Sequence, residues 1–60
     1  MQYLISGNNG FGRVNLGRET APAALKKAKE LLQDGYMDVR ISTPRGQVLL
    51  SDEFDQLEAS

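Results

Sequence analysis

The chain has 60 residues, with 7 basic and 8 acidic side chains and a formal net charge of −1. This length allows one small domain and leaves little room for an enzyme pocket, which typically measures roughly 300–1,000 Å³. The sequence has no cysteine and no histidine, which excludes disulfide bonds, thiolate metal sites and histidine acid–base catalysis. We therefore expect a domain that is not an enzyme and that holds no cofactor and no metal.

The distribution of charged and apolar residues bears on where the protein resides. Residues 1–50 hold all seven basic and four of the eight acidic side chains, a net charge of +3, and residues 51–60 hold the other four acidic ones, a net charge of −4. No segment reaches the roughly 18–20 apolar residues of a membrane span, and the start, MQYLIS, lacks the features of a signal peptide. Small secreted domains usually depend on disulfide bonds. We expect a cytoplasmic protein without membrane contact.

The first 16 residues predict a β-hairpin. In residues 2–6, Tyr3 and Ile5 alternate with polar or outward-facing positions, the period of a strand. Residues 7–10 read Gly-Asn-Asn-Gly, a turn sequence because glycine and asparagine tolerate positive φ. Residues 11–16 then return as the second strand, in which Gly12 marks a bulge or a weak point.

Residues 21–34 predict an amphipathic helix. Thr20 suits the N-cap, Pro22 suits the first turn, and Gly35 suits the position after the C-cap. The apolar residues follow the i, i+3, i+4, i+7 spacing of a buried helix face: Ala21, Ala24, Leu25, Ala28, Leu31 and Leu32.

The remainder of the chain predicts a second hairpin and an acidic end. Residues 37–42 alternate as a strand, the Thr-Pro-Arg-Gly sequence of residues 43–46 forms a turn, and residues 47–50 form the fourth strand. Residues 52–60 are either an acidic tail or a short helix anchored by Phe54 and Leu57.

These elements predict an α+β fold with the order ββαββ: a single domain over residues 1–51 in which one helix packs on a four-stranded, mainly antiparallel sheet. The strand order stays open. The predicted core consists of Tyr3, Ile5, Val14, Leu16, Leu25, Ala28, Leu32, Val39, Ile41, Val48 and Leu50. The opposite face of the sheet is predicted to be mixed and partly uncovered, with Leu4, Arg13, Asn15, Arg40, Gln47 and Leu49.

The glycine-rich hairpin GNNGFGRV, residues 7–14, resembles two known motifs. It resembles the nucleotide-covering loop of protein kinases, in which glycines let backbone amides approach phosphates. However, Asn9 stands at the second glycine position, and the chain has no His-Arg-Asp or Asp-Phe-Gly motif, so kinase activity is excluded. Residues 10–14 also resemble the first ribonucleoprotein submotif of RNA-recognition domains, whose aromatic residues stack on bases. Phe11 is the one aromatic residue retained there, and the motif falls on the second strand instead of the third.

A weaker hypothesis remains for the same hairpin. A glycine-rich turn can present backbone N–H groups to an anion, and arginine suits phosphate. The candidate contacts are Gly10, Phe11, Gly12, Arg13, Arg40 and Arg45, on the assumption that the three arginines lie near one sheet face. The competing interpretation is a turn that simply needs positive φ.

The other charged clusters carry weaker signals. Asp52, Glu53, Asp55 and Glu58 lack the spacing and the glycine of an EF-hand loop. Lys26, Lys27 and Lys29 read as the solvated face of the helix. The overall layout resembles that of many short bacterial proteins, without pointing to a named family.

An uncovered sheet face in so small a domain favours association. We expect a non-enzymatic module that acts by protein–protein interaction or by self-association, for example as a homodimer. The alternative is a phosphate-ligand or single-stranded nucleic-acid binder that uses the hairpin Gly7–Val14 and the nearby arginines.

Overall fold

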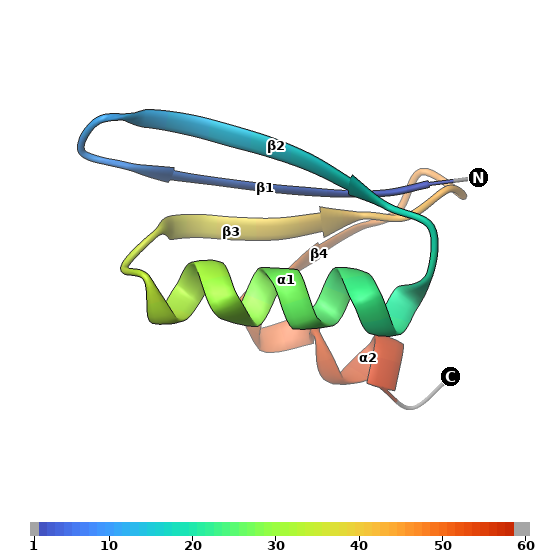
Figure 1. Cartoon of the computed structure of the whole chain (residues 1–60). Coiled ribbons are helices and arrows are strands. Elements are labelled where there is room, and N and C mark those ends of the chain that lie inside the picture. The colour runs from blue at the N-terminus through green and yellow to red at the C-terminus, as the bar shows by residue number, and fades with distance from the viewer. Residues whose placement is uncertain (1, 59–60) are drawn as a thin grey trace.

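The computed structural model describes residues 2–58. Its elements are β1 (Tyr3–Asn9), β2 (Gly12–Arg18), α1 (Ala21–Gln33), β3 (Met37–Ser42), β4 (Val48–Leu50), a 3-10 turn η1 (Ser51–Glu53) and a short helix α2 (Asp55–Glu58). Figure 1 shows α1 lying along one face of the sheet, with the C-terminal segment on the same side. The predicted ββαββ order and two-layer α+β arrangement are confirmed. No helix within the described residues is long and apolar enough to cross a membrane.

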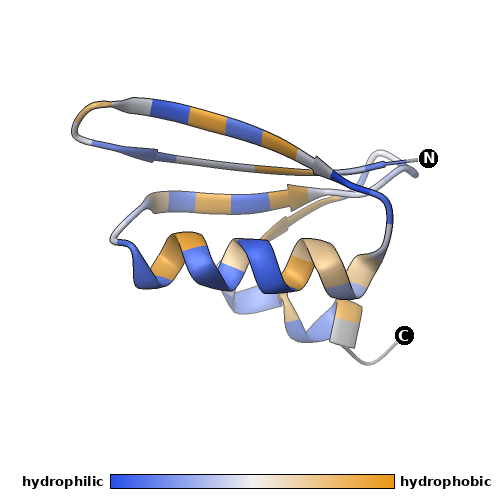
Figure 2. Ribbon diagram, viewed as in Figure 1, coloured by the Kyte–Doolittle hydropathy of each residue, from blue (hydrophilic) through white to orange (hydrophobic). Residues whose placement is uncertain are grey.

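The four strands form one antiparallel sheet in the order β2-β1-β3-β4. Ile5 of β1 pairs with Leu16 of β2 on one side and with Ile41 of β3 on the other. Directly opposed residues of an antiparallel pair point to the same face, so these three side chains lie in one row on the face that α1 covers. Apolar and polar residues alternate along β2 and β3, as Figure 2 shows.

Helix α1 begins at Ala21, as the sequence predicted, and ends at Gln33, one residue before the predicted end, with Asp34 as the C-cap. The side chain of Thr20 accepts a hydrogen bond from the backbone N–H of Ala23 at 3.3 Å, as an N-cap does. At the other end Gly35 has a φ of +90°. The N–H of Tyr36 donates to the carbonyl of Leu31, and the N–H of Gly35 donates to that of Leu32. This bond pair is a Schellman motif, which satisfies carbonyl groups that the helix itself leaves unpaired.

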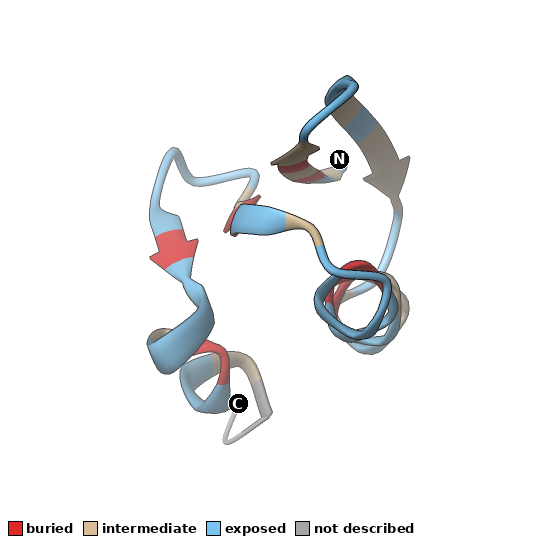
Figure 3. Cartoon of the chain, turned by 90° about the vertical axis from the view of Figure 1, so that its left-hand side faces the viewer, coloured by how far each residue is buried: buried red, intermediate tan, exposed pale blue. Residues whose placement is uncertain are grey.

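The core lies between α1, the inner face of the sheet and the C-terminal segment, as the buried positions in Figure 3 show. It is made of Ile5, Ala24, Leu25, Ala28, Leu31, Val39, Ile41, Leu49 and Phe54. Tyr3, Val14, Tyr36 and Leu57 pack against it and are partly buried. Five of the eleven predicted core residues are therefore fully buried, and Tyr3 and Val14 flank them.

Three of the predicted core residues are exposed instead: Leu32, Val48 and Leu50. On α1 the core contains Leu31 instead of Leu32. On β4 it contains Leu49 instead of Val48 and Leu50. For β4 the cause is the length of the turn. A two-residue loop closed by Thr43 and Gly46 would set Val48 opposite Ile41, but the N–H of Thr43 donates to the carbonyl of Gln47 at 2.8 Å.

The β3–β4 loop therefore has three residues, Pro44 to Gly46, and its last residue adopts a φ of +91°, as three-residue hairpin loops require. The extra loop residue shifts the pairing by one, so that Ile41 pairs with Leu49 and Ser42 with Val48. A shift of one residue moves every side chain of a strand to the opposite face. The prediction that Leu49 lies on the outer face is wrong for the same reason.

The acidic end of the chain is partly integrated in the fold. Phe54, between η1 and α2, is buried in the core, and the carboxylate of Glu53 accepts a hydrogen bond from the N–H of Leu50 at 3.1 Å. Helix α2 packs against α1. Met1 of the predicted domain 1–51 and residues 59–60 of the predicted tail 52–60 lie outside the described residues.

Candidate binding surface

The face of the sheet opposite α1 is not covered by any element among the described residues. We call it the open face. Three apolar side chains on it are about half exposed: Leu4 at 52%, Val48 at 48% and Leu50 at 48%. Leu4 and Val48 both pair with Ser42, and Leu50 pairs with Arg40, so the three lie around the same end of β3. The open face therefore has an apolar end.

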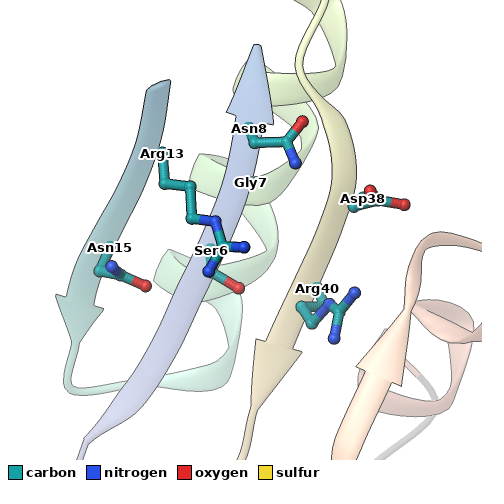
Figure 4. Close-up of a pocket in the computed structure, with 7 residues that line it drawn as sticks. All are labelled: Ser6, Gly7, Asn8, Arg13, Asn15, Asp38 and Arg40. Atoms are coloured by element: carbon teal, nitrogen blue, oxygen red, sulfur yellow. The ribbon is translucent and has the colours of Figure 1, made fainter. Parts of the chain in front are cut away.

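The other end of the open face is polar and hollowed. A shallow cavity of about 240 Å³ is lined by Ser6, Gly7, Asn8, Arg13, Asn15, Asp38 and Arg40, which we call the basin. Figure 4 shows these side chains rising from β1, β2 and β3 on the side of the sheet away from α1. Pairing of Asn8 with Arg13 and of Ser6 with both Asn15 and Arg40 brings them together.

A β-bulge lies beside Asp38 in the basin. The pairing of β1 with β3 shifts between Ser6 and Asn8, so that Gly7 lies opposite both Asp38 and Val39. Asp38 is the one non-glycine residue with positive φ within residues 2–58, at 55°, and bulges often use a left-handed residue of this kind. A methyl group on Gly7 would lie only 3.2 Å from Val39, so glycine lets the two strands approach beside the bulge.

The charges of the basin do not balance. Arg13 and Arg40 supply two positive charges and Asp38 supplies one negative charge. The guanidinium groups of Arg13 and Arg40 have no hydrogen-bond or ion-pair partner among the described residues. Their guanidinium groups keep their donors available, and arginine presents several donors in a planar fork that suits a carboxylate or a phosphate.

The backbone N–H groups at the tip of the glycine-rich hairpin already donate hydrogen bonds to a side chain of the turn, that of Asn9. Oδ1 of Asn9 accepts hydrogen bonds from the backbone N–H groups of Phe11 at 2.8 Å and of Gly12 at 3.0 Å. An anion at the turn would have to displace this asparagine to reach the same donors. Gly12 has a φ of +152°, whereas Gly10 does not have a positive φ, and a methyl group on it would lie within 4 Å of no atom beyond its chain neighbours. The turn therefore requires one of its glycines for a conformational reason.

The structure brings together some of the predicted contact residues and separates others. Arg13 and Arg40 share the basin. Gly10, Phe11 and Gly12 lie at the hairpin tip beyond it, where Phe11 is fully exposed. Arg45 lies in the β3–β4 turn at the opposite end of the sheet (Figure 1) and lines a different cavity, of about 420 Å³, with Tyr3, Pro44, Gln47 and Leu57 among others. The assumption that the three arginines lie near one face thus holds for two.

Sequence reasoning missed Asp38, Ser6 and Asn8 in the basin and Val48 and Leu50 on the apolar end. For Val48 and Leu50 the available signal was Gly46, because a glycine at the last position of a three-residue loop indicates the register that turns both side chains outward. Asp38 lies on the same face as Arg40, as the alternation along residues 37–42 predicts, although it was not among the predicted contacts. No group of three or more Asp, Glu, His or Cys side chains in the described part of the chain is arranged to hold a metal ion.

Comparisons with known proteins give no match, so the functional argument rests on the geometry of the open face and the basin. No protein-family model, no curated protein and no solved structure matches the chain.

Proposed function

We propose that this protein is a non-enzymatic module that acts by associating with another protein or with a second copy of itself through the open face. The observation that carries the proposal is the apolar end of that face, where Leu4, Val48 and Leu50 each remain about half exposed. Apolar side chains gathered on one uncovered surface are typical of interaction sites. The opposite face of the sheet is occupied by α1 and the C-terminal segment.

The polar end of the face supports the same function. An apolar centre beside charged and amide groups is the usual composition of a protein interface. Arg40 and Asp38 carry opposite charges on one surface, so two copies related by a twofold axis can pair each arginine with the other copy's aspartate. The same charges would also select among unrelated partners.

The dimensions of the molecule limit the strength of such an association. Its two longest extents are 32 and 20 Å. A face of 32 by 20 Å on each of two copies corresponds to about 1,300 Å² in total, near the lower limit of roughly 1,200–2,000 Å² for specific interfaces. We expect a weak or transient complex whose population depends on concentration.

The test is sedimentation velocity over a series from micromolar to millimolar protein, with the variant Leu4→Ser combined with Leu50→Ser. The average mass of the parent protein should rise with concentration, and the double variant should shift this rise to higher concentration. Leu32→Ser is the matched control, because Leu32 is similarly exposed, at 40%, but lies on α1. A double variant that behaves like the control would count against the open face.

A second candidate function is the binding of a phosphate-bearing ligand or of single-stranded nucleic acid. It is favoured by Arg13 and Arg40, which enter the basin from different strands and are unpartnered within residues 2–58. The exposed ring of Phe11 offers a surface on which a base can stack. Asp38 in the basin and the occupied N–H groups of the turn argue against it.

Amide-resolved NMR titration with Mg·ATP and with a short single-stranded RNA, compared with plain salt, distinguishes the two functions. Ligand binding predicts saturable shifts at Arg13 and Arg40 that Arg13→Ala weakens. The absence of shifts at millimolar ligand would exclude this second function and leave protein association.

A further inference from the structure

Strand β2 forms a long edge of the sheet. It is the outermost strand in the order β2-β1-β3-β4 and runs for seven residues, Gly12–Arg18. Figure 1 shows no described element beyond it. The other edge strand, β4, has only three residues and passes directly into η1. An exposed edge of this length is a template for another strand unless it is blocked.

The hydrogen-bonding groups that β2 presents can be assigned from the sheet. The N–H of Thr43 bonds to Gln47, so the backbone groups of Thr43 and Ile41 point to β4 and those of Ser42 and Arg40 point to β1. Leu4 and Ser6, their partners in β1, therefore bond to β3.

The same alternation continues into β2. The backbone groups of Ile5 and Gly7 bond to Leu16 and Val14. The residues between them, Arg13, Asn15 and Gly17, consequently direct their N–H and C=O groups outward from the sheet. The guanidinium of Arg18 donates to the carbonyl of Gly17 at 2.7 Å, as expected for an oxygen that no strand of the sheet uses. A carbonyl accepts two hydrogen bonds, so this contact leaves room for another strand.

The sequence of β2, GRVNLGR, is complementary to itself about its central residue. In an antiparallel pair of copies centred on Asn15, Val14 lies opposite Leu16, Arg13 opposite Gly17 and Gly12 opposite Arg18. No arginine lies opposite an arginine, and all seven residues are paired. The three residues with outward backbone groups meet one another in this register, so the bonds between the copies form without disturbing those to β1.

The environment of β2 also favours a partner there. Val14 and Leu16 face the α1 side of the sheet but are only partly buried, because α1 packs mainly against β1 and β3 and less against β2. A second copy would set Leu16 of one chain beside Val14 of the other, where opposed apolar side chains stabilise an antiparallel pair.

We propose that two copies of this chain pair through β2 in antiparallel register about Asn15, so that their sheets form one continuous eight-stranded sheet. Of the two partners that the proposed function allows, another protein or a second copy of the chain, this pairing specifies the second copy. It uses the edge of the sheet instead of the open face, so either proposal can fail without the other. In the dimer both helices lie on one side, and both open faces form one surface on the other.

Single cysteines test the register, since the chain has none of its own. In Asn15→Cys the two sulfurs flank the twofold axis, where the Cα atoms of a hydrogen-bonded pair lie about 5.5 Å apart, within the roughly 4.4–6.8 Å that a disulfide spans. Arg13→Cys is the matched control on the same strand and the same exposed face. In the proposed register its copy lies four residues away along the strand, about 13 Å.

After mild oxidation, Asn15→Cys should yield about tenfold more disulfide-linked dimer than Arg13→Cys, because linkage within a complex benefits from a high effective concentration. Leu4→Cys reports face-to-face contact. Equal linkage of Asn15→Cys and Arg13→Cys would overturn the register. Linkage through Leu4→Cys without linkage through Asn15→Cys would overturn edge pairing while leaving the open-face proposal intact.

Asn15→Pro provides a second test without cysteine chemistry. The N–H of Asn15 points outward, so proline in both copies removes the two bonds of the central pair while the ladder to β1 stays intact, which edge strands tolerate. Sedimentation should show less dimer for Asn15→Pro than for Asn15→Ala at equal concentration, with both variants folded by circular dichroism. Equal dimer content in the two folded variants would also overturn the proposal.

Discussion

Leu49 and Leu50 are adjacent residues of the same type with opposite environments. Leu49 is 2% exposed and contributes to the core, whereas Leu50 is 48% exposed on the open face. We predict that Leu49→Ala strongly destabilises the fold and that Leu50→Ala does not. Because both changes lie in the same short strand, the loss of β-propensity is similar in the two variants and cancels in their comparison.

The expected magnitudes follow from burial. Truncation of a fully buried leucine costs about 2–5 kcal/mol, which includes the cavity that it leaves. Full burial of a leucine side chain stabilises by roughly 1.5–3 kcal/mol, so half-buried Leu50 should cost about 1 kcal/mol and leave no cavity. For a chain of 60 residues the total free energy of unfolding is about 3–9 kcal/mol. Leu49→Ala thus removes a large fraction of the stability.

Urea denaturation followed by circular dichroism measures both variants, with the free energy of unfolding obtained by linear extrapolation. Protein is kept at low micromolar concentration, so that Leu50 reports its own environment and not an interface. A larger loss of stability for Leu50→Ala than for Leu49→Ala would refute the pairing of Ile41 with Leu49 and the three-residue turn that sets it.

Three further changes test local features by thermal unfolding or urea denaturation. Gly12→Ala should destabilise by about 1 kcal/mol or more because a side chain disfavours a φ of +152°, while Gly10→Ala should be nearly neutral; equal effects would contradict the assigned turn. Asp38→Gly should stabilise by up to about 1 kcal/mol, since glycine adopts the left-handed conformation at lower cost; a loss of stability would show that the carboxylate is needed in the basin. Thr20→Ala should cost about 1 kcal/mol through loss of the N-cap, and Thr20→Ser should retain most of it; an unaffected Thr20→Ala would contradict the cap.

The sequence by itself determined the elements whose signals are local. Helix α1 begins after Thr20 and ends before Gly35 because a cap, an apolar stripe and a left-handed glycine act within a few residues. Alternation identified the strands and placed Ile5, Val39 and Ile41 in the core. Arg13, Arg40 and Leu4 were correctly assigned to the uncovered face by the same period.

The tertiary structure decided what depends on how the elements meet. The strand order followed from the pairing of β1 with both β2 and β3, which no local signal encodes. One extra residue in the β3–β4 turn moved Leu49 inward and Val48 outward, since the face of a strand reverses with every one-residue shift. The length of the sheet separated Arg45 from Arg13, which line different cavities. A surface made from several strands depends on the register of their pairing. That register is set by interactions between segments that are distant in the chain, so no single segment encodes it.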